Sequence, residues 1–106
     1  MDYKTFINRA ANHGFRFDVR FDDGEWISEP AHRVTDPQEV IDHVKSVEMC
    51  VVRLWDDDES TSATWSATWV GTYLMTAFAD EPEESIIDYN SSSVWVDKNE
   101  LIAQFA

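Results

Sequence analysis

The chain has 106 residues, the size of one compact domain, and its hydrophobic share of 43% and aromatic share of 13% exclude a disordered acidic tail. Acidic residues number 21 against 8 Lys and Arg, which gives a net charge of −13. Direct binding to DNA or RNA requires a basic surface, so this charge argues against it and favours a positively charged partner.

Three features predict a cytoplasmic protein without membrane contact. The single cysteine, Cys50, cannot form an internal disulfide, which fits a reducing compartment. Residues 1–6 lack the basic start and the apolar stretch of a secretory signal. No apolar run approaches the roughly 18 to 20 residues of a membrane span, and anionic lipids repel an acidic chain.

The N-terminal part of the chain predicts a helix followed by a hairpin. Asp2 is placed to cap a helix over residues 3–13, and Gly14 is suited to end it. Residues 15–21 alternate Phe or Val with charged side chains, which is typical of a strand. The Asp-Gly pair at positions 23 and 24 predicts a turn into a short partner strand over residues 25–28.

The middle of the chain predicts a second helix and a buried strand. Asp36 as a cap, followed by Pro37 and an acid in the first turn, predicts a helix over residues 37–46. Residues 48–55 are almost continuously apolar, which predicts a central strand buried on both faces. Arg53 is the exception, and we expect it to reach a sheet edge or a carboxylate.

The next segment predicts the longest strand. Residues 63–78 alternate so that Trp65, Trp69 and Tyr73 share one face, and such a stripe is more typical of a core than of a contact surface. The acidic residues 80–84, interrupted by proline, predict a loop.

The C-terminal part predicts a short strand over residues 94–96 and a last helix capped by Asp97. The resulting order α-β-β-α-β-β-β-α predicts one α+β domain over residues 1–106. We expect a mostly antiparallel sheet of about four to five strands with two or three helices packed on it.

Negative charge is concentrated in the C-terminal half. Residues 1–53 contain 10 acids and 7 bases, whereas residues 54–106 contain 11 acids and one base. Two acidic clusters, at residues 56–59 and 80–84, bracket the predicted long strand, and a bend near Gly71 would bring them to one side of the sheet. Like charges oppose compactness unless salt, solvent or a cationic partner stabilises them. Ordinary solvated loops are one alternative, and adaptation to high salt is another, although it should enrich acids along the whole chain.

Carboxylates on one face can replace nucleic acid in a basic channel, because they accept charge-assisted hydrogen bonds from arginine and steer association. The sequence therefore predicts a small acidic protein that inhibits a nucleic-acid-handling target by DNA or RNA mimicry. In size, charge and lack of catalytic motifs, the chain resembles, as a class, phage anti-restriction and anti-CRISPR proteins and the immunity proteins that neutralise nuclease toxins. The predicted partner-contact acids are Asp56, Asp57, Asp58, Glu59, Asp80, Glu81, Glu83, Glu84 and Asp88.

Two tryptophans join this predicted contact surface. Trp26 lies just after the predicted hairpin turn and is a candidate half-exposed anchor. Trp55 adjoins residues 56–59, and an exposed indole beside carboxylates suits arginine, which both stacks and pairs. An adaptor or structural subunit that docks through the Trp26 face is the alternative, with acidic loops that only keep it in solution. A monomer and a homodimer both remain open.

No motif indicates an enzyme or a cofactor. The three histidines, His13, His32 and His43, lack the spacing of metal ligands. The acids at 56–59 lack the alternate spacing and the glycine of a calcium loop, so a metal-assisted enzyme built on them is only a third alternative. Glycine occurs only at positions 14, 24 and 71, which excludes a phosphate-binding loop. We therefore predict a binding protein without cofactor or metal.

Overall fold

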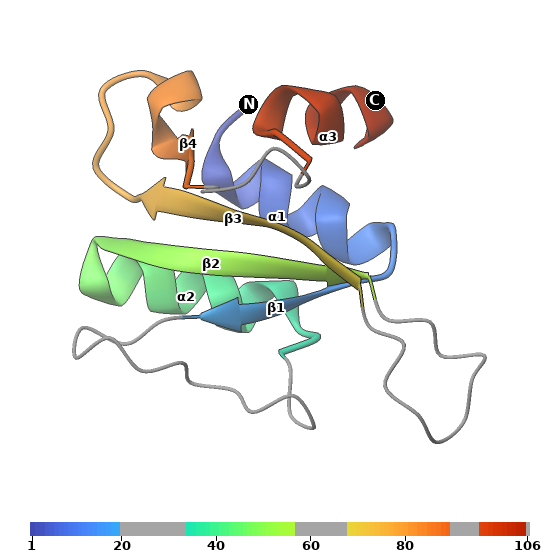
Figure 1. The fold of residues 1–106 in the computed structure, drawn as a ribbon. Coiled ribbons are helices and arrows are strands. Elements are labelled where there is room, and N and C mark those ends of the chain that lie inside the picture. Colours follow the sequence, from blue (N-terminus) through green and yellow to red (C-terminus); the bar gives the residue numbers. More distant parts are fainter. Residues whose placement is uncertain (20–33, 57–67, 90–95, 106) are drawn as a thin grey trace.

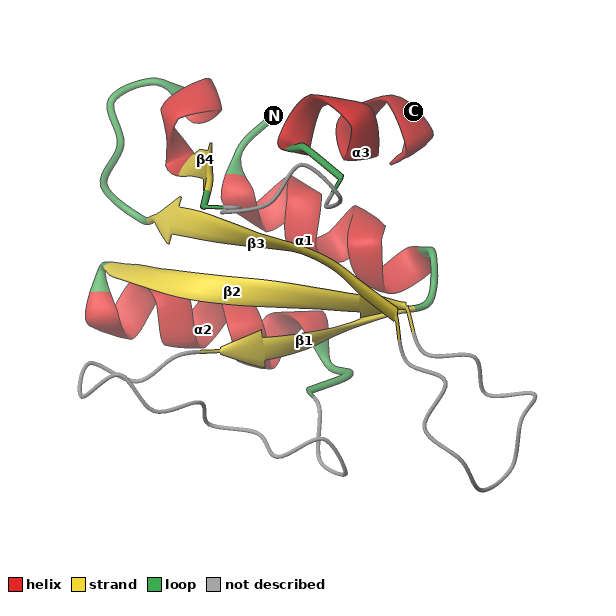
Figure 2. Cartoon of the chain, in the orientation of Figure 1, coloured by secondary structure: helices red, strands yellow, loops and turns green. Residues whose placement is uncertain are grey.

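The computed structural model describes residues 1–19, 34–56, 68–89 and 96–105. In these residues three helices pack on a four-stranded antiparallel sheet of order β1-β2-β3-β4 (Figure 1). The elements are α1 (Tyr3–Asn12), β1 (Phe15–Val19), α2 (Pro37–Val47), β2 (Met49–Asp56), β3 (Thr68–Thr76), the 3-10 turn η2 (Pro82–Ser85), β4 (Ile86–Asp88) and α3 (Lys98–Phe105). Figure 2 shows α1 and α2 side by side on one face of the sheet, with α3 next to α1. The predicted α+β fold class is confirmed.

The helices begin where the sequence predicts, because an aspartate side chain satisfies a backbone N–H that the first turn leaves without a partner. These oxygens accept from N–H groups at 2.9 Å (Asp2 from Thr5), 3.0 Å (Asp36 from Gln38) and 2.9 Å (Asp97 from Glu100). After α1, Gly14 adopts a φ of 86°, a left-handed conformation that glycine accepts without a steric penalty. The local capping signals therefore fix the helix limits.

The core lies between the sheet and the helices. Alternate strand residues point toward α1 and α2, and the register places Phe17 opposite Leu54 and Val52 opposite Tyr73. All of these side chains are fully buried. Phe6 of α1 joins the layers, since its ring makes edge contacts with the rings of Tyr73 and Phe105 at centroid distances of 5.5 and 5.4 Å.

Strand β2 is central, but the prediction that it is buried on both faces is wrong. Its residues alternate, with Cys50, Val52 and Leu54 buried and Met49 48% exposed. Among the described residues, helices α1 and α2 cover only one face of the sheet, so the opposite face stays partly open.

Strand β3 is shorter than the predicted strand over residues 63–78. It ends at Thr76, where a turn begins, and residues 63–67 lie outside the described part. The register also shifts, because Leu54 pairs with Gly71 whereas Trp55 pairs with Trp69. Val70 forms this bulge, so the predicted alternation from Trp69 to Tyr73 is interrupted.

The fourth strand differs from the prediction. Strand β4 comprises Ile86–Asp88, which the sequence pattern did not indicate because three residues are too few for a visible alternation. Of the predicted strand over residues 94–96, the described residue Val96 lies outside a strand and donates its N–H to the carbonyl of Val70 at 3.0 Å. The predicted hairpin partner over residues 25–28 lies outside the described residues. Beside β1 the described chain shows a bridge between Phe17 and Val34.

Candidate functional site

Among the described contact acids, Asp56 and the acids of residues 80–84 lie at opposite ends of the sheet. Asp56 is the last residue of β2 and pairs with Thr68, where β3 begins. The acids of residues 80–84 follow the other end of β3, where Thr76 pairs with Met49, and Asp88 pairs with Tyr73, three residues before that end. Because β3 has nine residues, its ends are roughly 26 Å apart. The structure therefore does not bring Asp56 to the second cluster, and residues 57–59 lie outside the described part.

The second cluster forms an exposed surface on a well-anchored backbone. We call it the acidic end, and it comprises Asp80, Glu81, Glu83, Glu84 and Asp88, all of which are exposed. Its anchor is Ser85, which is 5% exposed, accepts from the N–H of Tyr3 at 2.9 Å and donates to the carbonyl of Pro82 at 2.6 Å. The adjacent Ile86 is fully buried. The backbone is thus fixed to α1 and the core, while the carboxylates face solvent.

The one basic residue in this half of the chain does not form ion pairs with these carboxylates. Lys98 donates its ammonium to the carbonyl oxygens of Glu83 and Ile86, at 3.2 and 3.0 Å. Its backbone N–H donates to Asp88 at 2.7 Å. In residues 68–89 and 96–105, no ion pair joins the side chains of the acidic end to a basic group. The acidic end therefore keeps a strong excess of negative charge.

Residues distant in the sequence extend the acidic end, and the sequence analysis missed them. Glu48 ends α2 with a φ of 69°, is exposed, and accepts at its carbonyl from Ala77 at 2.8 Å. Large hydrophobic side chains are also exposed near this end of the sheet: Met49 (48%), Phe78 (61%) and Ile87 (47%). Exposed Tyr89 (53%) lies further from this end, beside Thr72. The aromatic residues that flank the acidic stretch, at positions 78 and 89, were the available signal.

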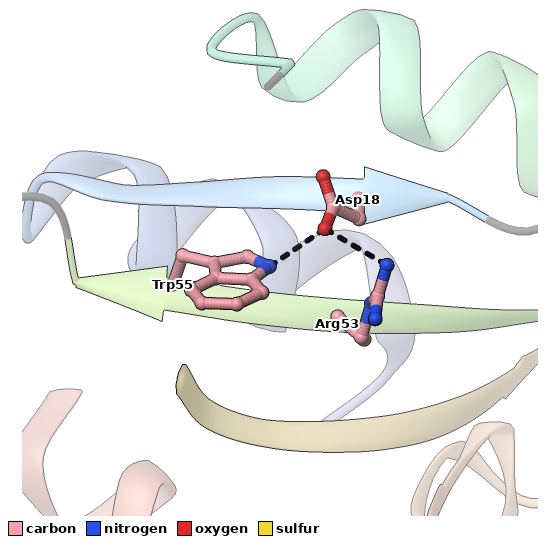
Figure 3. A network of polar contacts seen from close by, with 3 residues as sticks. All are labelled: Asp18, Arg53 and Trp55. Carbon is pink, nitrogen blue, oxygen red and sulfur yellow. Dashed lines mark hydrogen bonds and ion pairs between the residues drawn. The ribbon is translucent and has the colours of Figure 1, made fainter. Parts of the chain in front are cut away.

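Trp55 lies in a polar network on the face of the sheet opposite α1 and α2 (Figure 3). Its indole N–H donates to Asp18 Oδ2 at 2.7 Å, and Arg53 Nη2 lies 3.2 Å from the same oxygen. The Arg53 guanidinium is 5.9 Å from the centroid of the Trp55 ring. Asp18 is 3% exposed, so both contacts reach a buried carboxylate. The expectation that Arg53 reaches a carboxylate is confirmed.

This network changes the view of Trp55 as an anchor for a partner's arginine. The predicted combination of an indole with a carboxylate is present, but the chain's own Arg53 occupies it. Trp55 is half-buried rather than exposed. A partner contact of Trp55 stays a prediction, and Trp26 lies outside the described residues.

No metal-binding arrangement is visible within the described ranges. These ranges hold no group of three or more His, Cys, Asp or Glu placed to bind a metal. His13 is exposed and packs its ring 5.1 Å from that of Phe105, His43 is half-buried on α2, and His32 lies outside the described part. The pKa of Asp2 is lowered mainly by the N–H of Thr5, and burial raises the pKa of Tyr3, so both shifts belong to the start of α1.

In the described part of the chain, no helix has the length and apolar character needed to cross a bilayer. Comparison with protein-family models, curated proteins and solved structures finds no match to this chain. The class of protein is therefore defined by the fold and the surface alone. The chain is an α+β domain with an anchored acidic end, and its exposed carboxylates are suited to accept hydrogen bonds from Arg or Lys.

Proposed function

We propose that this protein binds a positively charged, nucleic-acid-handling protein and inhibits it by occupying a phosphate-binding surface. The observation that supports this proposal most directly is the acidic end, where Lys98 bonds backbone carbonyls and the carboxylates have no basic partner among the described residues. An exposed set of like charges on a fixed backbone binds a cationic surface with little loss of conformational entropy.

The distance between Asp56 and the acidic end supports mimicry of an extended polyanion. The ends of β3 are roughly 26 Å apart, which equals about seven to eight phosphate steps of 3.4 Å along one DNA strand. Asp56 lies at one end and the acidic end lies at the other. Asp56 and the acidic end would therefore engage separate groups of Arg and Lys along a nucleic-acid channel, and their charge would accelerate association.

The experiment uses the tagged full chain and a pair of matched charge variants. The test variant E83Q/E84Q removes two charges from the acidic end, and the control E39Q/E100Q removes two exposed charges from the starts of α2 and α3. The tagged chain captures partner proteins from lysate at low salt, and duplex DNA elutes them. The eluted partner is purified, and its binding to nucleic acid is measured in the presence of each variant. We expect E83Q/E84Q to weaken inhibition about tenfold and E39Q/E100Q to change it little.

If the two variants weaken inhibition equally, the net charge of the chain matters and the position of the acidic end does not, and the proposal would fail. A partner that stays bound at about 0.5 M salt and is not displaced by duplex DNA would instead indicate an adaptor, because apolar contacts are not screened. A captured nuclease toxin whose activity the chain blocks would assign the protein to the immunity type of inhibitor.

A further inference from the structure

The face of the sheet opposite α1 and α2, which we call the open face, carries a row of apolar side chains. The register pairs Val51 with Leu74 and Leu74 with Ile87, and paired residues of antiparallel strands present their side chains on the same face. Cys50 and Val52 point into the core, so Met49 and Val51 point to the open face. Tyr89 continues the pairing of β4, since its N–H donates to the carbonyl of Thr72 at 2.9 Å.

These side chains form a patch of unusual exposure. The apolar patch comprises Met49, Val51, Leu74, Ile87 and Tyr89. Met49, Ile87 and Tyr89 are 48%, 47% and 53% exposed, and Val51 and Leu74 are half-buried between them. Single exposed hydrophobic residues are normal on a protein surface, whereas neighbouring ones on adjacent strands form a contiguous apolar surface that can bind a partner.

The charge around the patch indicates what covers it. Glu48 directly precedes Met49, and Glu83 and Glu84 lie in η2, directly before β4; all three acids are exposed. Asp88 pairs with Tyr73, so its side chain points to the opposite face, where it accepts from the N–H of Lys98. A second copy of the chain would place the same negative rim against itself, and an anionic lipid surface would also be repelled. The complementary occupant is a cationic protein segment whose apolar side chains project between its Lys and Arg residues.

We propose that the apolar patch and the acidic end form one contact surface for such a basic amphipathic segment of the partner. This inference rests on the proposed function and adds the feature that selects the target. Carboxylates alone attract any cationic surface, whereas the patch adds binding energy only when apolar side chains stand beside the partner's basic groups. Because apolar burial is not screened, part of the affinity survives salt that weakens the ionic part.

The test uses two synthetic peptides of equal length and equal positive charge as probes. One is an amphipathic Leu/Lys peptide, and in the other Ser replaces every Leu. Binding to the full chain is measured by calorimetry at low and at about 0.5 M salt. Three variants are compared. I87S/Y89S removes the apolar groups, and the position-matched control I87V/Y89F retains them. E83Q/E84Q removes two charges from the acidic end. Thermal melting of each variant confirms that the fold is intact.

We expect the wild-type chain to bind the Leu peptide about tenfold more tightly than the Ser peptide. I87S/Y89S should remove this preference, I87V/Y89F should keep it, and E83Q/E84Q should weaken both peptides alike. An unchanged preference in I87S/Y89S would overturn the inference and leave the proposed function standing. Failure of the wild-type chain to bind either peptide at low salt would overturn the proposed function itself. A wild-type dimer that I87S/Y89S dissociates would show that the patch serves self-association, which also overturns the inference.

Discussion

The two faces of the sheet use the same strands for different purposes. On the face covered by α1 and α2, Phe17, Val52 and Tyr73 are 0% exposed and form the core. One residue away along each strand, Asp18, Arg53 and Thr72 lie on the open face in the same register, where Asp18 and Thr72 are buried as well, at 3% and 5% exposure. Because strand side chains alternate, a one-residue shift of register would exchange these roles. The pairing of the strands therefore fixes which side chains enter the core and which lie on the open face.

The largest expected difference between the faces is in core stability. Leu54→Ala on the covered face removes a fully buried side chain, and we expect a loss of about 2 to 5 kcal/mol in the free energy of unfolding. Ile87→Ala on the open face removes a side chain that is 47% exposed, so the loss should stay below about 1 kcal/mol. Urea denaturation measures both, and similar losses would contradict the division into a structural and a free face.

The polar network gives the next effect, on the open face itself. Asp18→Ala removes the acceptor of the Trp55 indole and the partner of Arg53, and we expect a loss of about 2 kcal/mol, since bonds to a buried carboxylate are charge-assisted. The emission of Trp55 should change as well. The matched test is a double-mutant cycle that combines Asp18→Ala with Arg53→Met. A double variant whose loss of unfolding free energy equals the sum of the single losses would show that the two groups do not interact.

A close approach on the covered face gives a third prediction. The ring of Tyr73 lies over Gly71, and a β-carbon at Gly71 would stand 2.8 Å from Tyr73 Cζ and closer still to its hydroxyl oxygen. That hydroxyl donates to the carbonyl of Val96 at 2.7 Å. We expect Gly71→Ala to cost about 1 to 3 kcal/mol, measured by thermal unfolding. In the Tyr73→Phe background, which lacks the hydroxyl oxygen but keeps the ring carbons, the cost should be smaller. An equal cost there would show that the hydroxyl oxygen is not the source of the clash.

The smallest effect concerns the start of α1, outside either face. Asp2→Ala removes the cap on Thr5 and should cost about 1 kcal/mol near neutral pH. The folded-state pKa of Asp2 lies below its ordinary value of 3.8, so its stabilisation is present above that value and is lost as the pH falls through the lowered pKa. The difference in unfolding free energy between wild type and variant should therefore shrink in acid, and a difference that is constant with pH would exclude a role for the charge.

The sequence predicts the local features of this molecule and misses the tertiary ones. The three helices follow from aspartate caps and apolar spacing, both of which act within a few residues. Strand β4 escapes prediction because three residues contain no period, and only pairing with β3 defines it.

The candidate site shows the same limit. Glu81, Glu83 and Glu84 stand out in the sequence by their charge, but Glu48 reaches the same end through the contact of its carbonyl with Ala77. The exposure of Ile87 and Tyr89 depends on the register of β4, which no pattern in the sequence specifies. Predicting the apolar patch would require the sheet order first.

The contact between Phe6 and Phe105 has a consequence for how the chain reaches its native state. These rings belong to the first and last helices, and Phe15 also lies 6.0 Å from Phe105, so the final helix completes a cluster begun at the other end of the sequence. Closing such a long loop costs entropy before any contact rewards it, which slows folding. We therefore expect α3 to dock late, after the sheet has formed, with the aromatic rings of α1 and β1 transiently open to solvent.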